Sequence, residues 1–230
     1  MNNSENNFTQ EIPIEYDDLK FNWTVRFMAH LNSYLFHPLF VPLYIILFLL
    51  YIHPDAFVGF SSTQKLQVIV IVIVNVIVFP LISVLLLRAV GFIDSIYLKN
   101  QKDRIIPYIA SGIFFFWAYN VFKQQSQYPT IWIIYLLGLF LASSAALIAN
   151  IYFKVSMHAI GVGGWLGLFI LIVRAQEMQM SWPFASVLLI TGMVCTSRMI
   201  LKAHRPFDIY GGLIIGIVTQ FTAAYFLAAP

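Results

Sequence analysis

The chain has 230 residues, of which 60% are hydrophobic and only 10% are charged, and its net charge is +3. A water-soluble domain carries roughly 25% charged residues, so this composition excludes a water-facing globular protein and indicates a protein embedded in lipid. The mild net charge, without a long basic run, argues against nucleic acid as a partner. A single cysteine, Cys195, excludes an intrachain disulfide, and we interpret it as a packing residue of an apolar segment.

The N-terminal region is polar, and half of the ten acidic residues fall within its first 18 positions. It lacks the basic, apolar and small-residue pattern of a cleaved signal peptide. We expect residues 1–32 to form a polar tail with a short interfacial helix around residues 21–31, in which Trp23 and Phe27 are membrane anchors. Residues 33–230 are expected to form one transmembrane domain.

Seven apolar stretches approach the length of about 20 residues that a membrane-spanning helix needs. They are residues 34–52, 66–88, 107–122, 130–150, 159–173, 182–197 and 209–229. The third, fifth and sixth are short, so six spans is the alternative to seven. Backbone groups in hydrocarbon must be satisfied internally, and continuous runs such as Val68–Val78 lack the alternation of a barrel. The sequence therefore predicts an all-α fold, a polytopic transmembrane helical bundle of six to seven spans.

The interiors of these stretches contain no Asp, Glu, Lys or Arg. Ion pathways and proton relays place such groups at depth, where each costs about 2.5 to 3.5 kcal/mol, so the pattern argues against transport and light sensing. Small residues recur at spacings of three and four in the later stretches, which allows helices to approach closely. They are Gly161, Gly164, Gly167, Gly212 and Gly216.

Ionisable residues gather in three connections between the stretches, at residues 99–104, 154–158 and 198–208. Two expected spans separate the first connection from the second, and two separate the second from the third. This even parity places all three connections on one face of the membrane. We therefore predict that they build a single site.

The third connection contains the clearest chemistry. His204 and Asp208 are four positions apart, within reach of one another in a helix or a turn. A carboxylate on one imidazole nitrogen fixes the tautomer and makes the other nitrogen more basic. Arg198 offers a planar fork that suits phosphate oxygens. The alternative is a basic stripe beside the membrane that contacts anionic head groups.

The second connection offers an ammonium, a hydroxyl and an imidazole just before an apolar stretch, in Lys154, Ser156 and His158. The alternative for a lone histidine here is a polar cap on a helix end. The first connection is less specific, because basic residues such as Lys102 and Arg104 beside a membrane are ordinary determinants of topology.

Together, the three connections resemble the three-part signature of the type 2 phosphatidic acid phosphatase (PAP2) superfamily, over about residues 97–230. The third part of the family signature, S-R-x5-H-x3-D, is met with both spacings intact at Ser197, Arg198, His204 and Asp208. The second part, P-S-G-H, matches in its serine and histidine, since the chain has Val155-Ser156-Met157-His158.

The first part of the signature, K-x6-R-P, is met only at Arg104. Tyr97 occupies the position of the lysine, and Pro107 comes two residues late. The candidates to replace the missing lysine are Lys99, Lys102 and Lys154, and the sequence does not choose among them.

The resemblance implies a phosphatase that needs no metal and no cofactor. In it His204 attacks phosphorus and is oriented by Asp208, and His158 protonates the leaving group and then activates water. The implied phosphate-binding residues are Arg104, Arg198 and Ser156, with Lys102 and Lys154 as further candidates. The carboxylates near the connections are too few for a two-metal site of oxygen ligands; they are Asp94, Asp103 and Asp208.

The expected substrate is a phosphomonoester or diphosphate on a membrane lipid, and the expected partners are that substrate and membrane lipids. A lipid phosphotransferase and a non-catalytic lipid-binding protein are the alternatives. The excess of Lys and Arg on the motif-bearing face would make that face cytoplasmic. The resemblance instead implies a site that faces outward, to periplasm or lumen. We expect an integral protein of a bacterial inner (plasma) membrane with its active site on the outer face.

Overall fold

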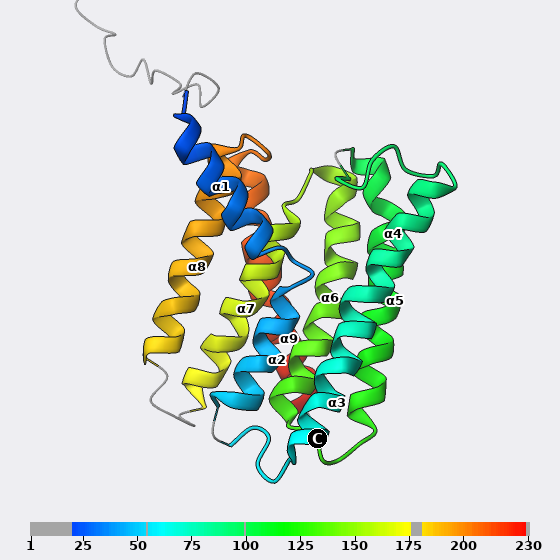
Figure 1. The fold of residues 1–230 in the computed structure, drawn as a ribbon, viewed down its shortest axis with the longest axis vertical. Coiled ribbons are helices and arrows are strands. Elements are labelled where there is room, and N and C mark those ends of the chain that lie inside the picture. The colour runs from blue at the N-terminus through cyan, green and yellow to red at the C-terminus, as the bar shows by residue number, and fades with distance from the viewer. Residues whose placement is uncertain (1–19, 54, 99, 176–180, 229–230) are drawn as a thin grey trace, which may run out of the picture.

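The computed structural model describes residues 20–53, 55–98, 100–175 and 181–228. Most of the predicted polar tail, residues 1–19, lies outside these residues. The described chain is a bundle of helices without strands (Figure 1), which confirms the all-α prediction. The elements are α1 (Trp23–Leu35), α2 (Val41–Tyr51), α3 (Ser62–Val72), the π-helix η2 (Ile73–Val78), α4 (Phe79–Ala89), α5 (Gln101–Lys123), α6 (Thr130–Tyr152), α7 (Met157–Arg174), α8 (Ser181–Ile200) and α9 (Pro206–Ala228).

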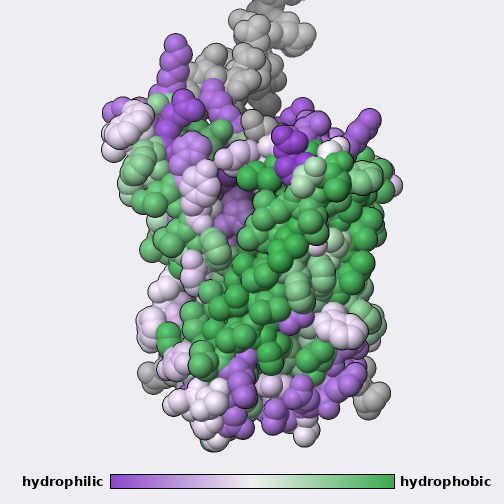
Figure 2. Space-filling model, turned by 45° about the vertical axis from the view of Figure 1, so that its right-hand side comes forward, coloured by the Kyte–Doolittle hydropathy of each residue, from purple (hydrophilic) through white to green (hydrophobic). Residues whose placement is uncertain are grey.

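Six helices of the described residues are long and apolar enough to cross a membrane. The first is the continuous run of α3, η2 and α4, and the others are α5 to α9. The three stretches that are short in the sequence extend at their ends to helices of 23, 18 and 20 residues. On the face seen in Figure 2, hydrophobic residues cover the middle of the molecule, and hydrophilic residues gather at its upper and lower ends. The chain is an integral membrane protein.

The predicted span at residues 34–52 is wrong. α1 ends at Leu35, and α2 is an 11-residue helix that begins at Val41, so it extends only about 16 Å. The break falls at His37-Pro38, because proline lacks a backbone N–H and disfavours helical geometry in the residue before it. A count of apolar residues misses the break, since neither residue is charged. In Figure 1, α1 and α2 together lead the chain from the upper to the lower end, at an angle to one another.

Helix α1 lies where the sequence predicts an interfacial helix and runs four residues further than expected, across the boundary placed at residue 32. The Trp23 and Phe27 rings are exposed and stack at 5.6 Å between centroids. On its buried side, Asn32 donates a 2.8 Å hydrogen bond from Nδ2 to the hydroxyl of Ser197 on α8. Helix α1 is therefore attached to the bundle through its last turn.

Close packing of α7 on α9 sets the relative position of the second and third connections. A Cβ on Gly163 of α7 would lie 2.5 Å from the Leu213 carbonyl oxygen, and one on Gly216 of α9 would meet the Ile160 carbonyl oxygen. Only glycine permits this approach, as the spacing of small residues predicts. The N-terminal ends of α7 and α9 consequently lie side by side at the upper end of the molecule.

Candidate active site

The three predicted connections meet at the upper end of the bundle (Figure 1). Arg104 at the start of α5 donates from Nη1 to the Val155 carbonyl at 2.8 Å, which joins the first connection to the second. The Ser156 backbone N–H donates to the Asp208 carbonyl at 3.1 Å, which joins the second to the third. The structure therefore brings the three connections together at one end of the bundle, as the parity of the spans predicts. In the upper half of the face seen in Figure 2, hydrophilic residues lie in a recess.

Arg104 is buried, and its guanidinium braces the site from the side of α5. Besides its bond to Val155, it donates from Nε to the Leu98 carbonyl at 2.8 Å. The carboxylate of Asp208 lies close enough to favour the charged form of the Arg104 guanidinium. Two of its N–H groups therefore fix the first connection against the second.

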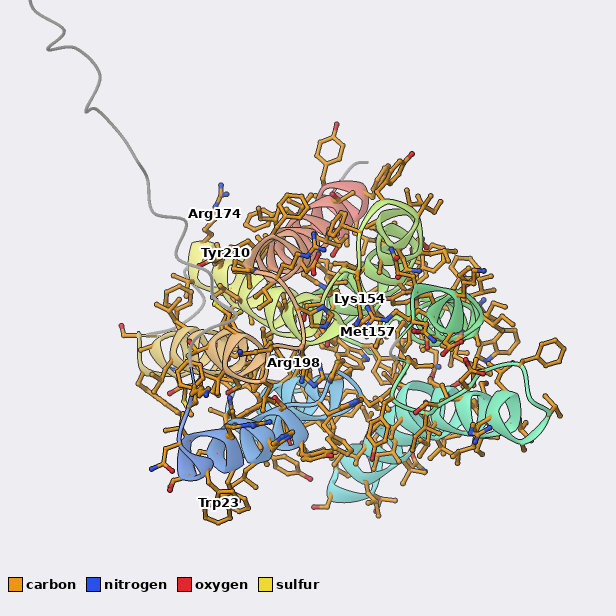
Figure 3. The ribbon with its side chains drawn as sticks, turned by 90° about the horizontal axis from the view of Figure 1, so that it is seen from above. Trp23, Lys154, Met157, Arg174, Arg198 and Tyr210 are labelled. Carbon is orange, nitrogen blue, oxygen red and sulfur yellow. The ribbon has the colours of Figure 1, made fainter. Side chains whose placement is uncertain are left out.

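Arg198 occupies the last turn of α8 and is half-buried. Its Nε is buried and has no hydrogen-bond partner among the described residues. An unsatisfied buried N–H costs about 1 to 3 kcal/mol, so the position favours an anionic ligand. In the view from above, Arg198 and Lys154 lie near the centre of the bundle, whereas Trp23 and Arg174 lie at its periphery (Figure 3).

His204 lies in the turn between α8 and α9, and its Nδ1 is 3.0 Å from the carbonyl oxygen of Lys154. A carbonyl only accepts, so Nδ1 bears the proton and the neutral ring has its lone pair on Nε2. Burial lowers the pKa of His204 to about 3, and the charges of Arg198 and Arg104 act in the same direction. The ring is therefore neutral near neutral pH and presents an unprotonated nitrogen.

Asp208 has a different partner from the one that the sequence predicts. Asp208 lies in the first turn of α9, and its Oδ2 accepts the backbone N–H of Arg205 at 3.1 Å. His204 bonds instead to the Lys154 carbonyl. The reason is that Pro206 starts a new helix after the turn, so His204 precedes α9 and does not share a helical face with Asp208. The backbone of the second connection thus orients the imidazole.

His158 lies in the first turn of α7, with its Nε2 3.1 Å from the Ser33 carbonyl oxygen. By the same argument Nε2 bears the proton, and Nδ1 is the nitrogen that changes its protonation. The ring of His37 stands edge-on to the His158 ring, at 5.2 Å between centroids. Ser33 and His37 were missed from the sequence, although a histidine beside a proline within an apolar stretch is a signal that could have found them.

Ser156 is fully buried, and its hydroxyl accepts the Ala159 N–H at 3.4 Å as the N-cap of α7. Of the candidates to replace the missing lysine, Lys154 is half-buried, and its positive charge contributes to the lowered pKa of His204. Lys102 is exposed. Lys99 lies outside the described residues. The structure thus brings Lys154, but not Lys102, to the centre of the site.

Across the residues that the structure describes, no group of three or more His, Cys, Asp or Glu side chains is placed to hold a metal ion. The groups that do converge are guanidinium, ammonium and imidazole side chains. The guanidinium and ammonium groups are donors to an anion, and their positive charge opposes the binding of a cation.

Comparison with protein families gives a match to the PAP2 superfamily at residues 150–229. No curated protein and no solved structure matches the chain. The matched segment contains the second and third connections, and with them Ser156, His158, Arg198, His204 and Asp208. Arg104, α1 and α2 lie outside it. This match over residues 150–229, together with the geometry of the two connections, supports membership of the PAP2 superfamily.

Proposed function

We propose that the chain is a metal-independent phosphatase that hydrolyses a phosphate ester or diphosphate on a membrane lipid through a phosphohistidine at His204. The observation that carries the proposal is the buried Nε of Arg198, which has no hydrogen-bond partner among the described residues. The same guanidinium lies close enough to His204 for its positive charge to lower the pKa of that imidazole. A phosphoryl group is the ligand that would contact both the guanidinium of Arg198 and the imidazole of His204.

The cationic groups explain how the phosphoryl group is bound. Arg198 and Arg104 are planar forks that bind two oxygens at once, and Lys154 adds a third positive charge beside His204. The N-terminus of α7, capped by Ser156, adds the positive end of a helix dipole. Donors fixed in this way stabilise the charge that develops on the equatorial oxygens in the transition state.

The two histidine tautomers suggest how the first step proceeds. The lone pair on Nε2 of His204 forms a bond to phosphorus, and the bond from phosphorus to the lipid oxygen breaks in line with it. The departing oxygen takes a proton from Nδ1 of His158, so that the lipid leaves as an alcohol or a monophosphate. The Lys154 carbonyl holds the proton of Nδ1 on His204 throughout this step.

The second step releases phosphate. His158, now neutral, takes a proton from a water molecule, whose oxygen bonds to phosphorus while the bond from phosphorus to Nε2 of His204 breaks. Inorganic phosphate leaves and both rings regain their starting protonation. No redox change occurs, and the only co-reactant is water.

An apolar groove of about 350 Å³ supports a lipid as the substrate. It lies between α2, α7 and α8 and is lined by aromatic and aliphatic side chains, including Tyr44 and Trp165, whose rings stack at 5.8 Å. The Phe36 ring contacts the rings of Tyr44 and Trp165, with centroid distances of 6.0 and 6.3 Å. Phe36 is adjacent in sequence to His37. The groove runs from Tyr44 and Trp165 toward Ile52 and Trp182, at the end of the bundle opposite the site, so a hydrocarbon chain in it would lie in the membrane interior below the site.

The test is phosphate release by the purified protein from a panel of lipid phosphates and from a water-soluble aryl phosphate, with His204→Ala as the control. We expect turnover that survives EDTA and is inhibited by vanadate, which forms a five-coordinate mimic of the transferring phosphoryl group. Loss of activity in EDTA that a divalent ion restores would contradict the metal-free mechanism. Transfer of phosphate to a second lipid would indicate a phosphotransferase, and no turnover on any substrate would indicate a non-catalytic protein.

A further inference from the structure

The junction between α1 and α2 contributes a residue to the site that neither the matched family segment nor the sequence motifs include. His37 lies in this junction, far outside residues 150–229. Its ring meets that of His158 edge-on, with an interplanar angle of 84° and 5.2 Å between centroids. The last turn of α1, just before this junction, supplies the Ser33 carbonyl that bonds Nε2 of His158. Two independent contacts therefore link the general acid to the N-terminal segment.

The backbone holds His37 in a single orientation. The N–H of Leu39 donates to its Nδ1 at 3.3 Å, so the neutral ring has its proton on Nε2. The next residue, Pro38, packs on α7, where a Cβ on Gly161 would lie 3.4 Å from the Pro38 Cα. The His37 ring is thus fixed against the same helix that bears His158, and its position does not depend on a bound ligand.

The charges around the pair favour a neutral His37. Arg198 of α8 acts on both His37 and His158, and His204 acts on His158 from the third connection. Burial, followed by the charge of Arg198, lowers the pKa of His37 to about 4. A neutral neighbour matters because His158 must become an imidazolium to protonate the leaving group, and a second cation beside it would oppose this.

We propose that His37 is a positioning residue for His158: its neutral ring holds the His158 ring edge-on, so that Nδ1 faces the leaving group while Nε2 stays on the Ser33 carbonyl. The inference rests on the proposed function for the role of His158 as the general acid. It assigns to the N-terminal segment, through the helix break at His37-Pro38, a part in the chemistry of the site.

The signature of such a role is a dependence on the leaving group. An aryl phosphate leaves with little protonation, whereas an alkyl phosphate needs the acid. We expect His37→Ala to lower kcat on an alkyl phosphate about 10- to 100-fold, part of the 10² to 10⁴ that general acid catalysis provides, and to affect the aryl phosphate several-fold less. His37→Phe, which keeps an edge-on ring, should restore most of the alkyl activity. The matched control is His30→Ala, an exposed histidine of α1, which should behave as the wild type.

A double-mutant cycle separates positioning from a general structural effect. In a His158→Ala background, His37→Ala should cause little further loss, because the residue through which it acts is already absent. Additive losses, an unchanged ratio of alkyl to aryl activity in His37→Ala, or a His37→Phe variant as impaired as His37→Ala would each overturn the inference. Gel filtration and thermal unfolding establish that each variant is folded.

A readout without substrate separates this inference from the proposed function. Carbethoxylation of His158 by diethyl pyrocarbonate, followed by mass spectrometry, should be several-fold faster in His37→Ala than in the wild type or in His30→Ala. If the wild type hydrolyses no phosphate ester, the proposed function fails, and this rate alone decides whether His37 covers His158. An equal rate in all three proteins would overturn the contact itself.

Discussion

Two backbone carbonyls determine which ring nitrogen of His204 and of His158 carries the proton. Lys154 bonds Nδ1 of His204, and Ser33 bonds Nε2 of His158, so the atoms that react in the proposed mechanism are Nε2 of His204 and Nδ1 of His158. Spacing in the sequence identifies the two histidines but not these partners, because a backbone carbonyl can come from any residue. Ser33 lies 125 positions from His158, and no local pattern reports such a contact.

The first residue-scale prediction distinguishes the two histidines. His158→Ala should be severely impaired on an alkyl phosphate, by about 10² to 10⁴, and much less impaired on an activated aryl phosphate. His204→Ala should be inactive on both, since an activated leaving group does not replace a nucleophile. Steady-state kinetics on the two substrates measures this difference. If His204→Ala keeps aryl phosphatase activity while His158→Ala has none, the two roles are reversed.

The second prediction concerns the guanidinium of Arg198. Arg198→Lys keeps the charge but loses the planar fork and the Nε that has no partner, so kcat/KM should fall about 10²-fold, the effect of removing one donor to developing charge. The control is Arg205→Lys in the same connection, where the arginine is exposed; its activity should stay within about twofold. Equal activity of the two variants would exclude Arg198 from phosphate binding.

The same arginine sets a pH dependence. His204 must be neutral to attack, and because its pKa is about 3 its protonation does not limit kcat/KM near neutral pH. A positive neighbour disfavours the imidazolium, so Arg198→Gln should raise the pKa of His204 toward its ordinary value of about 6.5. The acid limb of kcat/KM should then move to higher pH than in the wild type. An acid limb that stays in place would show that Arg198 does not act on His204.

At the scale of elements, hydropathy predicts the six long helices because each of them is an uninterrupted apolar run of sufficient length. It fails at α1 and α2, where the break is caused by the backbone of Pro38 and not by polarity. Even parity correctly places the three connections together because it depends only on the spans between them, and the wrong span at residues 34–52 precedes all three. Parity gives no information about the segment before the connections, from which Ser33 and His37 contact His158.

Packing of α7 against α9 provides the element-scale prediction. Gly216→Ala would place a methyl group against the Ile160 carbonyl and within 2.6 Å of the Gly164 nitrogen, so the helices must separate, at a cost of about 1 to 3 kcal/mol. The melting temperature in detergent should fall. Gly192→Ala is the matched control, since its Cβ would meet nothing within 4 Å and alanine favours a helix by about 1 kcal/mol over glycine. Equal melting temperatures for the two variants would contradict close packing at Gly216.

At the scale of the whole molecule, the distribution of positive charge and the family resemblance disagree about orientation. The end that bears the motifs contains more Lys and Arg than the opposite end, where the basic residues of the connections are Lys65, Lys123 and Arg174. Such an excess normally marks the cytoplasmic side. Three cations of the motif end, Arg104, Arg198 and Lys154, are half-buried or buried at the site, so the proposed phosphate binding would account for them without reference to topology.

We therefore expect the site to face outward, and single cysteines in a Cys195→Ser background test this. Tyr97 and Lys202 are exposed at the motif end, and Gln125 is exposed at the opposite end. An impermeant thiol reagent on intact cells should label cysteines at positions 97 and 202, and should label position 125 only after permeabilisation. The reverse pattern would place the site in the cytoplasm, in agreement with the positive-inside rule. Labelling of only one of positions 97 and 202 would contradict the arrangement of the connections on one face, because a single orientation exposes both or neither.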